Sequence, residues 1–238
     1  MFKELNTDGM EETQDRLGGF NLLESGGYDG VIKLVYVTNS SKSQSKCVVT
    51  EVDYGGHVMT ERTWVTSGKG DPYYERDGKK IPLPGYDLIN SMCLVATGLG
   101  LADQDFEDKT IKVWDKEAGK EIDKSMPVIT SLLGEPVTAG VLKQIVNKQV
   151  QQGDKWVDTN DQREENVTDK YFHSETKRTV AEIKNKLDLE EADLFYTKWT
   201  EKNTGQTRNR FKEVKGAPAA GSSGTGSPGA AKSKSLFE

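Results

Sequence analysis

Aromatic rings and positive charges are interspersed along residues 62–80, which read RTWVTSGKGDPYYERDGKK. Flat rings stack on unpaired bases at about 1–3 kcal/mol per base, and lysine and arginine neutralise the phosphates between those bases. The pattern is therefore typical of a surface that binds single-stranded nucleic acid. Together with two residues further upstream, the candidate DNA-binding residues are Lys33, Tyr36, Arg62, Trp64, Lys69, Tyr73, Tyr74, Arg76, Lys79 and Lys80.

The same stretch also has an interpretation that involves no ligand. Asp71, Glu75 and Asp77 dilute its positive charge. In this alternative the tyrosines belong partly to the protein's own core, and the charged side chains of a folded-back loop are simply solvated. Composition alone leaves both interpretations open.

Other site chemistries lack the spacing that they need. Gly68-Lys69 is followed by Gly70 where a phosphate loop needs Ser or Thr. Zinc ligands usually come in pairs two to four residues apart, which is not true of Cys47, His57, Cys93 and His173. No HExxH motif or nucleophile elbow occurs. We therefore expect neither an enzyme nor a metal or cofactor site.

Charge and composition limit the class of protein. The 238 residues have a net charge of −6, yet residues 28–80 carry 8 basic and 7 acidic side chains. A polyanion would thus be bound by a local patch and not by a uniformly basic surface. The two cysteines are too few for a disulfide framework. The sequence contains no apolar run of about 18 residues, the length that would predict a transmembrane helix. The acidic N-terminal stretch does not resemble a secretory signal, so we expect a cytoplasmic protein without membrane contact.

Three strands are predicted to position the aromatic and basic residues. Residues 28–39 are rich in β-branched and aromatic side chains, and residues 47–54 and 57–66 form two similar runs around Gly55-Gly56. A Gly-Gly pair between two such runs predicts a hairpin. The aromatic and basic stretch therefore begins at the end of the third strand of a meander.

The rest of the chain is predicted to alternate between helices and strands. Asp87 is a candidate N-cap for a helix over 88–97 that ends at Gly98. Patterns of alternation predict a hairpin over 111–122 and a long strand over 141–151, whereas the polar run 158–166 predicts a loop. Two capping-box patterns, Thr179 to Glu182 and Asp188 to Glu191, predict two C-terminal helices, the second ending at Asn203–Gly205.

The composition changes at Gly216. Residues 216–235 are dominated by Gly, Ala, Ser and Pro, which predicts a flexible tether. A short apolar and acidic terminus follows, and it is a candidate for binding a partner protein: Leu236, Phe237 and Glu238. A cloning remnant is the alternative explanation of this tail.

Several phrases of the sequence resemble the single-stranded DNA-binding proteins of lytic podoviruses. They are EVDYGGHVMTERTWVTSG, DPYYERDGKKIPLPGY, LINSMCLVATG, VLKQIVNKQV with REEN after it, and EKNTGQTRNR. Together they span most of residues 10–212. The resemblance implies a mainly β fold with helices (α+β), in which an OB-like five-stranded barrel carries an inserted helix and C-terminal helices. It also implies binding without sequence preference and a C-terminus that docks replication or recombination proteins.

These observations lead to one expected organisation and function. We expect an N-terminal arm (1–27), an OB-like nucleic-acid-binding domain (28–215) with a helical part at about 174–204, and a flexible tail (216–238). The expected function is to coat and protect single-stranded DNA during viral replication or recombination, in the cytoplasm of an infected bacterium. The alternatives are a viral structural or adaptor protein that uses the aromatic loop for protein contacts, and a transcription cofactor that acts on opened template DNA.

Overall fold

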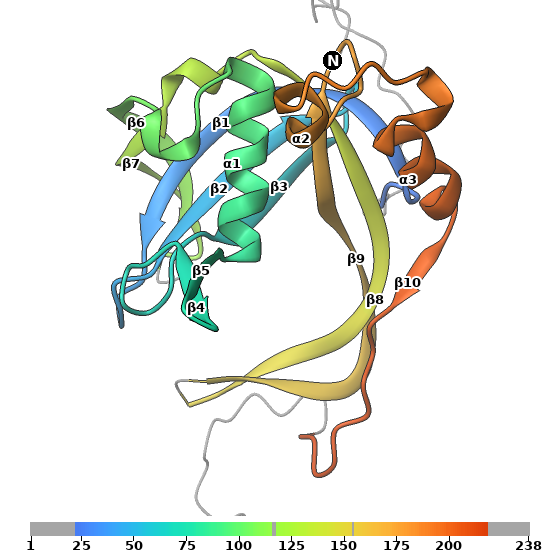
Figure 1. Ribbon diagram of the computed structural model, residues 1–238. Coiled ribbons are helices and arrows are strands. Elements are labelled where there is room, and N and C mark those ends of the chain that lie inside the picture. Colours follow the sequence, from blue (N-terminus) through green and yellow to red (C-terminus); the bar gives the residue numbers. More distant parts are fainter. Residues whose placement is uncertain (1–21, 116–117, 154, 219–238) are drawn as a thin grey trace, which may run out of the picture.

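The computed structural model describes residues 22–115, 118–153 and 155–218. About half of these residues lie in β-strands, nearly all of them antiparallel, and the α-helices among them are α1 (Pro84–Thr97), α2 (Val180–Lys184) and α3 (Phe195–Asn203) (Figure 1). The prediction of a mainly β, α+β fold is therefore confirmed. Most of the expected N-terminal arm (residues 1–21) and of the tail (residues 219–238) lies outside the described residues.

The meander predicted from the sequence is present. It consists of β1 (Gly26–Asn39), β2 (Lys46–Asp53) and β3 (Val58–Trp64), with β2 antiparallel to both neighbours. Gly55 and Gly56 have φ angles of 67° and 98° in the connection between β2 and β3, a region that favours glycine. Alternation along β2 places Val48 and Val52 in the core under α1 and turns Val49 and Glu51 to the opposite face.

Two long strands make the other half of the sheet. β8 (Pro136–Gln152) pairs with β1 through its first residues and with β9 (Lys155–His173) along its whole length. A short strand, β10 (Thr207–Asn209), runs parallel to β8. The distal part of the β8–β9 hairpin extends below the helices in the view of Figure 1 and curves back towards the side on which β1, β2 and β3 lie.

The prediction of a loop at residues 158–166 was wrong, because these residues are the middle of β9. Gln162, Glu164 and Glu165 pair with Asn147, Ile145 and Gln144 of β8, respectively. This part of the hairpin is exposed over much of its surface, so its strands need few apolar side chains. A polar composition therefore hid a strand whose partner is specified by long-range pairing.

The main path of strands runs β3-β2-β1-β8-β9. Its two ends, β3 and β9, share no backbone ladder in the described residues, so closure of a five-stranded barrel stays a prediction. They meet instead through the Glu61 carboxylate, which accepts hydrogen bonds from the Thr168 amide (2.9 Å) and the Thr168 hydroxyl. Burial raises the pKa of the Glu61 carboxyl group above its ordinary value.

Helix α1 lies between β3 and β8 in the sequence and covers the core face of the sheet. It buries Ile89, Met92, Cys93 and Val95. The prediction that Asp87 caps this helix was wrong: Leu83 is the N-cap, Pro84 begins the helix, and Asp87 lies in its first turn. The predicted end at Gly98 is confirmed by a left-handed C-cap whose N–H donates to the Leu94 carbonyl at 3.0 Å.

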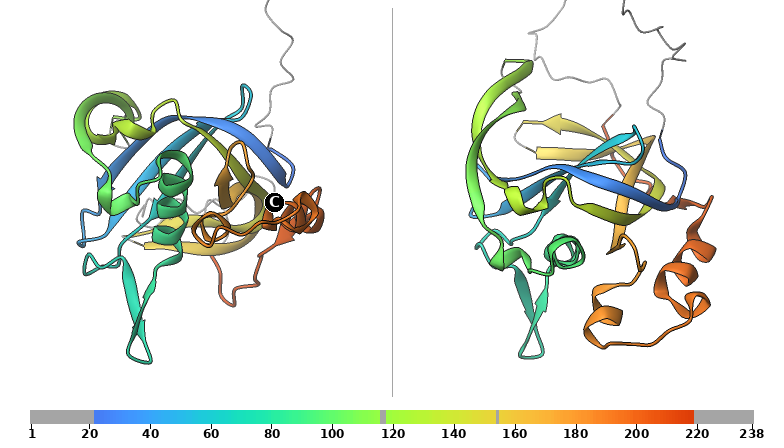
Figure 2. Two further views of the ribbon diagram at one scale, coloured as in Figure 1. Left: turned by 45° about the horizontal axis from the view of Figure 1, so that its top comes forward. Right: turned by 90° about the horizontal axis from the view of Figure 1, so that it is seen from above.

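Two hairpins flank the sheet. The first is β4 (Tyr73–Arg76) with β5 (Lys79–Pro82), and the second is β6 (Phe106–Asp115) with β7 (Lys120–Ile129). The second contains the hairpin predicted over 111–122. Figure 2 shows β6–β7 curling past one side of the β1–β2–β3 sheet, with α1 on the other side. Short 3₁₀ turns at Leu101–Asp103 and Thr130–Leu132 connect these elements to their neighbours.

The C-terminal helices agree with the sequence only in part. The capping box at Thr179 and Glu182 is confirmed at the start of α2. Asp188 caps no helix, because a 3₁₀ turn at Glu191–Asp193 comes first and α3 follows Leu194. Trp199 of α3 is buried against Leu142 and Phe172, which fixes the helix on the outer face of β8.

Candidate nucleic-acid interface

Most of the predicted aromatic and basic residues lie at one end of the β1–β2–β3 sheet. The end is defined by the pairs Asn39–Lys46 and Cys47–Trp64. The loops that leave it are joined to each other, since the Gln44 amide donates to the Gly68 carbonyl at 3.2 Å. The β4–β5 hairpin also starts here, and a hydrogen bond from the Leu83 amide to the Pro72 carbonyl (2.9 Å) closes its base.

Part of the aromatic loop expected from the sequence is a β-hairpin with two distinct faces. Its turn residues Asp77 and Gly78 have φ angles of 52° and 71°, as a tight hairpin turn requires. Cross-strand pairs share a face in an antiparallel ladder. The register therefore places the following side chains together on one face: Tyr74, Arg76, Lys79 and Ile81. Arg76 and Lys79 are exposed, as is Tyr74 at 44%.

The opposite face of this hairpin is occupied by its own contacts. The Lys80 ammonium lies 4.4 Å from the centre of the Tyr73 ring, which covers part of that ring. Contact with the Tyr73 hydroxyl raises the pKa of Lys80. Glu75 is the cross-strand neighbour of Lys80 on this face. Tyr74 thus offers a more accessible ring than Tyr73.

Strand β3 contributes a second aromatic and basic pair. Arg62 and Trp64 are two residues apart, so their side chains lie on the same face of the sheet, opposite the α1 side. Trp64 is 54% exposed. Gly85 at the start of α1 packs so tightly behind this strand that an added Cβ would lie 2.1 Å from the Trp64 carbonyl oxygen. The backbone of β3 is therefore held firmly beneath its exposed ring.

The structure separates Tyr36 and Lys33 from this group. Tyr36 is 4% exposed and packs with Val49 and Val128 under the β6–β7 hairpin, so it is a core residue and not an accessible stacking ring. Burial raises the pKa of its hydroxyl. Lys33 forms an ion pair with Asp53 at 3.6 Å, towards the opposite end of the sheet.

Of the remaining candidates, Lys69 lies within the described residues and the C-terminal three do not. Lys69 is exposed in the turn that follows β3. The predicted partner-binding residues Leu236, Phe237 and Glu238 lie outside the described residues.

Exposed tryptophans of two further strands were missed by the sequence analysis. Trp114 of β6 is 60% exposed and Trp156 of β9 is 56% exposed. Each has a charged residue on one side and a valine on the other, and the charged neighbours, Asp115 and Lys155, were the signal available in the sequence. Large rings on a surface commonly mark contacts with another molecule.

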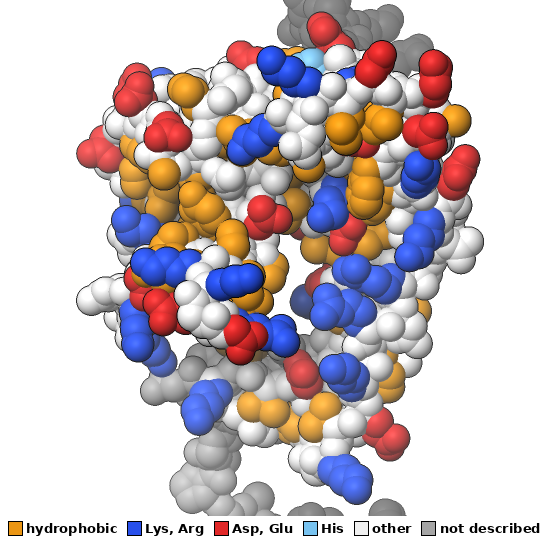
Figure 3. Space-filling model, viewed as in Figure 1, with side chains coloured by type: hydrophobic (Ala, Val, Ile, Leu, Met, Phe, Trp, Pro, Cys, Tyr) orange, Lys and Arg blue, Asp and Glu red, His pale blue; other side chains and the backbone are white. Residues whose placement is uncertain are grey.

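Positive side chains also surround a hollow in the molecule. Figure 3 shows this hollow between the β4–β5 hairpin and the β8–β9 hairpin, with Lys and Arg side chains on both sides of it. Exposed basic residues of the elements concerned include Arg76, Lys79 and Lys80 on the first hairpin, and Lys148, Lys155 and Arg163 on the second. Exposed acidic residues lie on the same two hairpins, Glu75 and Asp77 on the first and Asp161 and Glu164 on the second, so the hairpins carry charges of both signs.

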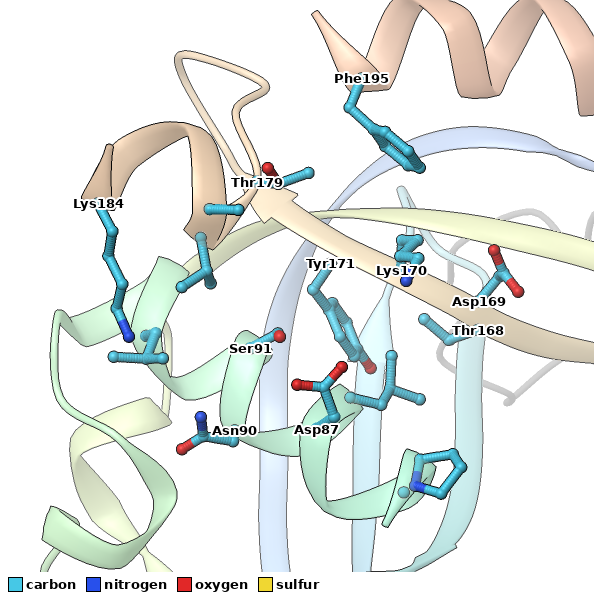
Figure 4. Close-up of a pocket in the computed structure, with 16 residues that line it drawn as sticks. Asp87, Asn90, Ser91, Thr168, Asp169, Lys170, Tyr171, Thr179, Lys184 and Phe195 are labelled. Carbon is cyan, nitrogen blue, oxygen red and sulfur yellow. The ribbon is translucent and has the colours of Figure 1, made fainter. Parts of the chain in front are cut away.

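A separate cavity of about 790 Å³ lies between α1, β9 and α2 (Figure 4). Asp87, Asp169, Lys170 and Lys184 contribute charges of both signs to its lining, and Phe195 contributes a ring. The Asp169 carboxylate accepts a hydrogen bond from the Trp199 indole at 2.9 Å. Balanced charge gives this cavity no preference for a polyanion.

The described residues contain no group of three or more His, Cys, Asp and Glu side chains that could hold a metal ion. None of the helices in this part of the chain is long and apolar enough to cross a membrane.

No protein-family model matches the chain, and no curated protein matches it.

Proposed function

We propose that this protein binds single-stranded DNA, and that it coats and protects the strand during viral DNA replication or recombination in an infected bacterium. Binding is stoichiometric and involves no catalysis. Rings stack on unpaired bases while basic side chains neutralise the phosphates between them. Neither contact reads base identity, so binding tolerates different sequences.

The face of β4–β5 that carries Tyr74, Arg76 and Lys79 is the observation that supports this proposal most. An accessible ring and two cations share this face, and the hairpin register holds them in a fixed arrangement. Arg76 forms its ion pair with Asp77 at 3.7 Å between side chains that are 72% and 88% exposed. Such an exposed pair is worth about 0–1 kcal/mol, so a phosphate can replace it.

The order of elements supports an OB-like barrel as the scaffold. Five strands follow the path β3-β2-β1-β8-β9, and α1 is inserted between the third and fourth of them in the sequence. On this proposal the Glu61–Thr168 contact joins the two end strands and closes the barrel. Folds of this class present strands and loops to single-stranded nucleic acid.

The test is equilibrium binding of a fluorescent oligo-dT strand to single variants of the hairpin. Tyr74→Ala should weaken binding by about 1–3 kcal/mol. Lys79→Gln should lower the slope of log affinity against log salt by about 0.7, the value for one phosphate contact on a single strand. Glu75→Gln, on the opposite face of the hairpin, is the matched control and should retain affinity. Absence of oligo-dT binding by the unaltered protein would refute the proposal.

A further inference from the structure

Strand β6 is paired along only one of its two edges in the part of the chain that the structure describes. Its residues, Phe106–Asp115, form an unbroken antiparallel ladder with β7, and no other described strand pairs with β6. The β6–β7 hairpin lies at the margin of the molecule (Figures 1 and 2). We call the open side of the strand the β6 edge. A long open edge presents backbone N–H and C=O groups without strand partners, and it is a template for pairing with another chain.

One face of β6 is open as well as its edge. Ile111 and Val113 pack towards the sheet, in the cluster that contains Tyr36 and Val128. Side chains at the even-numbered positions of the strand therefore point to the opposite, outer face. All five of them are exposed: Phe106, Asp108, Thr110, Lys112 and Trp114.

The outer face of β6 is complementary to itself when a second copy of the strand runs antiparallel beside it. If Thr110 lies opposite Thr110 of the second copy, Phe106 lies opposite Trp114 and Asp108 lies opposite Lys112, and each of these pairs occurs twice. Aromatic pairs, Thr–Thr pairs and opposite-charge pairs are the cross-strand contacts that stabilise antiparallel sheets. Neither Asp108 nor Lys112 forms an ion pair with another described residue, so both charges are available to a second copy.

Neighbouring registers lack this complementarity. Directly opposed residues of antiparallel strands point to the same face, so a register that keeps the outer faces together changes in steps of two residues. A shift in one direction places Phe106 opposite Lys112, and a shift in the other direction places Asp108 opposite Trp114. Both shifts remove the aromatic pairs and the charge pairs together. The sequence of β6 therefore favours one register.

We propose that two copies of this protein form a dimer through the β6 edge, in which the two β6 strands pair antiparallel about a twofold axis at Thr110. The two β6–β7 hairpins then form one continuous sheet with the strand order β7-β6-β6-β7. The same patch is used by both copies, so the contact is closed and association stops at the dimer. This inference goes beyond the proposed function and does not depend on DNA binding.

Charge reversal tests both the dimer and its register. Dimerisation of the full chain is measured by sedimentation velocity over a series of protein concentrations. Asp108→Lys places two lysines opposite each other at two positions, and Lys112→Asp places two acids opposite each other at two positions. Each variant alone should dimerise at least about tenfold more weakly than the unaltered protein. An equimolar mixture of the two variants should form heterodimers, because lysine then lies opposite aspartate at both positions.

Glu121→Lys is the matched control for these variants. Glu121 is exposed on the outer face of the same hairpin, and the substitution changes the charge by the same amount as Asp108→Lys. It lies on β7, opposite Trp114, and therefore outside the β6 edge. Dimerisation of this variant should stay within about twofold of that of the unaltered protein.

A cysteine at the proposed axis gives an independent result. Opposed Cα atoms in an antiparallel ladder are about 4.5–5.5 Å apart, a distance that a disulfide spans. Thr110→Cys should therefore form a disulfide-linked dimer under mild oxidation. Ser125→Cys is the control, because Ser125 is the β7 partner of Thr110 and its two copies would lie about 14 Å apart, three strand spacings. The native cysteines, Cys47 and Cys93, are buried and should not crosslink.

Three results would overturn this inference. They are a monomer at every concentration, a dimer that neither charge variant weakens, and a mixture of the two folded variants that forms no heterodimer. Urea unfolding of each variant shows whether it is folded. If a charge variant does not fold, the crosslink decides: a yield from Thr110→Cys no higher than that from Ser125→Cys contradicts pairing at the β6 edge.

Discussion

Glu61 offers the sharpest test of how the two ends of the sheet are held together. Its carboxylate accepts hydrogen bonds from the amide and hydroxyl of Thr168, a residue that is 2% exposed. Glu61→Ala removes both acceptors. The hydroxyl can rotate towards another partner, whereas the amide is fixed by the strand and loses its acceptor. A buried donor without a partner costs about 1–3 kcal/mol, which is the expected loss of unfolding free energy.

Glu61→Gln separates the hydrogen bonds from the charge. The amide side chain keeps an acceptor for the Thr168 N–H and gains a donor for the Thr168 hydroxyl, while the ionised form is lost. Burial raises the pKa of Glu61 in the folded state, so the folded protein holds a proton that the unfolded chain releases. The stability due to this proton is complete below the unfolded pKa of about 4.5 and is lost as the pH rises through the folded pKa.

The assay is urea unfolding of the native protein and of Glu61→Gln over a series of pH values from the unfolded pKa upwards. As the pH rises, Glu61→Gln should become more stable relative to the native protein. The total change in this difference of unfolding free energies should be about 1.4 kcal/mol for each unit by which folding raises the pKa of Glu61. The test relies on the difference between the two proteins and not on the pH dependence of either one. Burial also raises the pKa of Glu51, which makes the unfolding free energy of both proteins depend on pH. Parallel curves for the two proteins, or no loss of stability in Glu61→Ala, would refute this reasoning.

Two further predictions concern the C-terminal helices. Gly140→Ala places a Cβ 2.9 Å from the Trp199 ring, so it should lower the free energy of unfolding, measured with urea, by about 1–3 kcal/mol. Gly68→Ala is the control: no atom lies within 4 Å of the added Cβ, so its free energy of unfolding should change by no more than about 0.5 kcal/mol. Glu182 behaves oppositely to Glu61: partial burial opposes ionisation, but hydrogen bonds from the backbone amides of Thr179 and Phe195 leave its pKa lowered. The stability that Glu182 contributes is therefore present above the unfolded pKa of about 4.5 and is lost as the pH falls through the folded pKa. Glu182→Gln should make the unfolding free energy fall less steeply as the pH is lowered through this range. An unchanged fall contradicts this prediction.

Local signals in the sequence were sufficient for the elements that depend on neighbouring residues. Alternating apolar positions and the Gly55-Gly56 pair predicted the meander β1–β2–β3 correctly. Gly98 marked the end of α1, and Thr179 with Glu182 marked the start of α2. Each of these signals acts through the backbone of a few adjacent residues, so no knowledge of the tertiary structure was required.

Features that depend on distant partners were not predictable in the same way. Strand β9 has a polar middle because its partner β8, and not a core, holds it in place. Tyr36 belongs to an alternating strand and could have faced a ligand, but the β6–β7 hairpin covers its face of the sheet. The common face of Tyr74 and Lys79 follows from the register of the β4–β5 hairpin, which was not predicted because this stretch was expected to be a loop.

Binding of single-stranded DNA is the central claim, and one titration tests it most directly. Trp64, Trp114 and Trp156 are more than half exposed and Trp199 is buried, so intrinsic fluorescence reports mainly on surface rings. The protein is titrated with oligo-dT and with a duplex of matching length, each at low and at high salt. The account predicts strong quenching by oligo-dT that weakens at high salt, and a much smaller response to the duplex. No response to oligo-dT at either salt concentration, or equal responses to single strand and duplex, would contradict it.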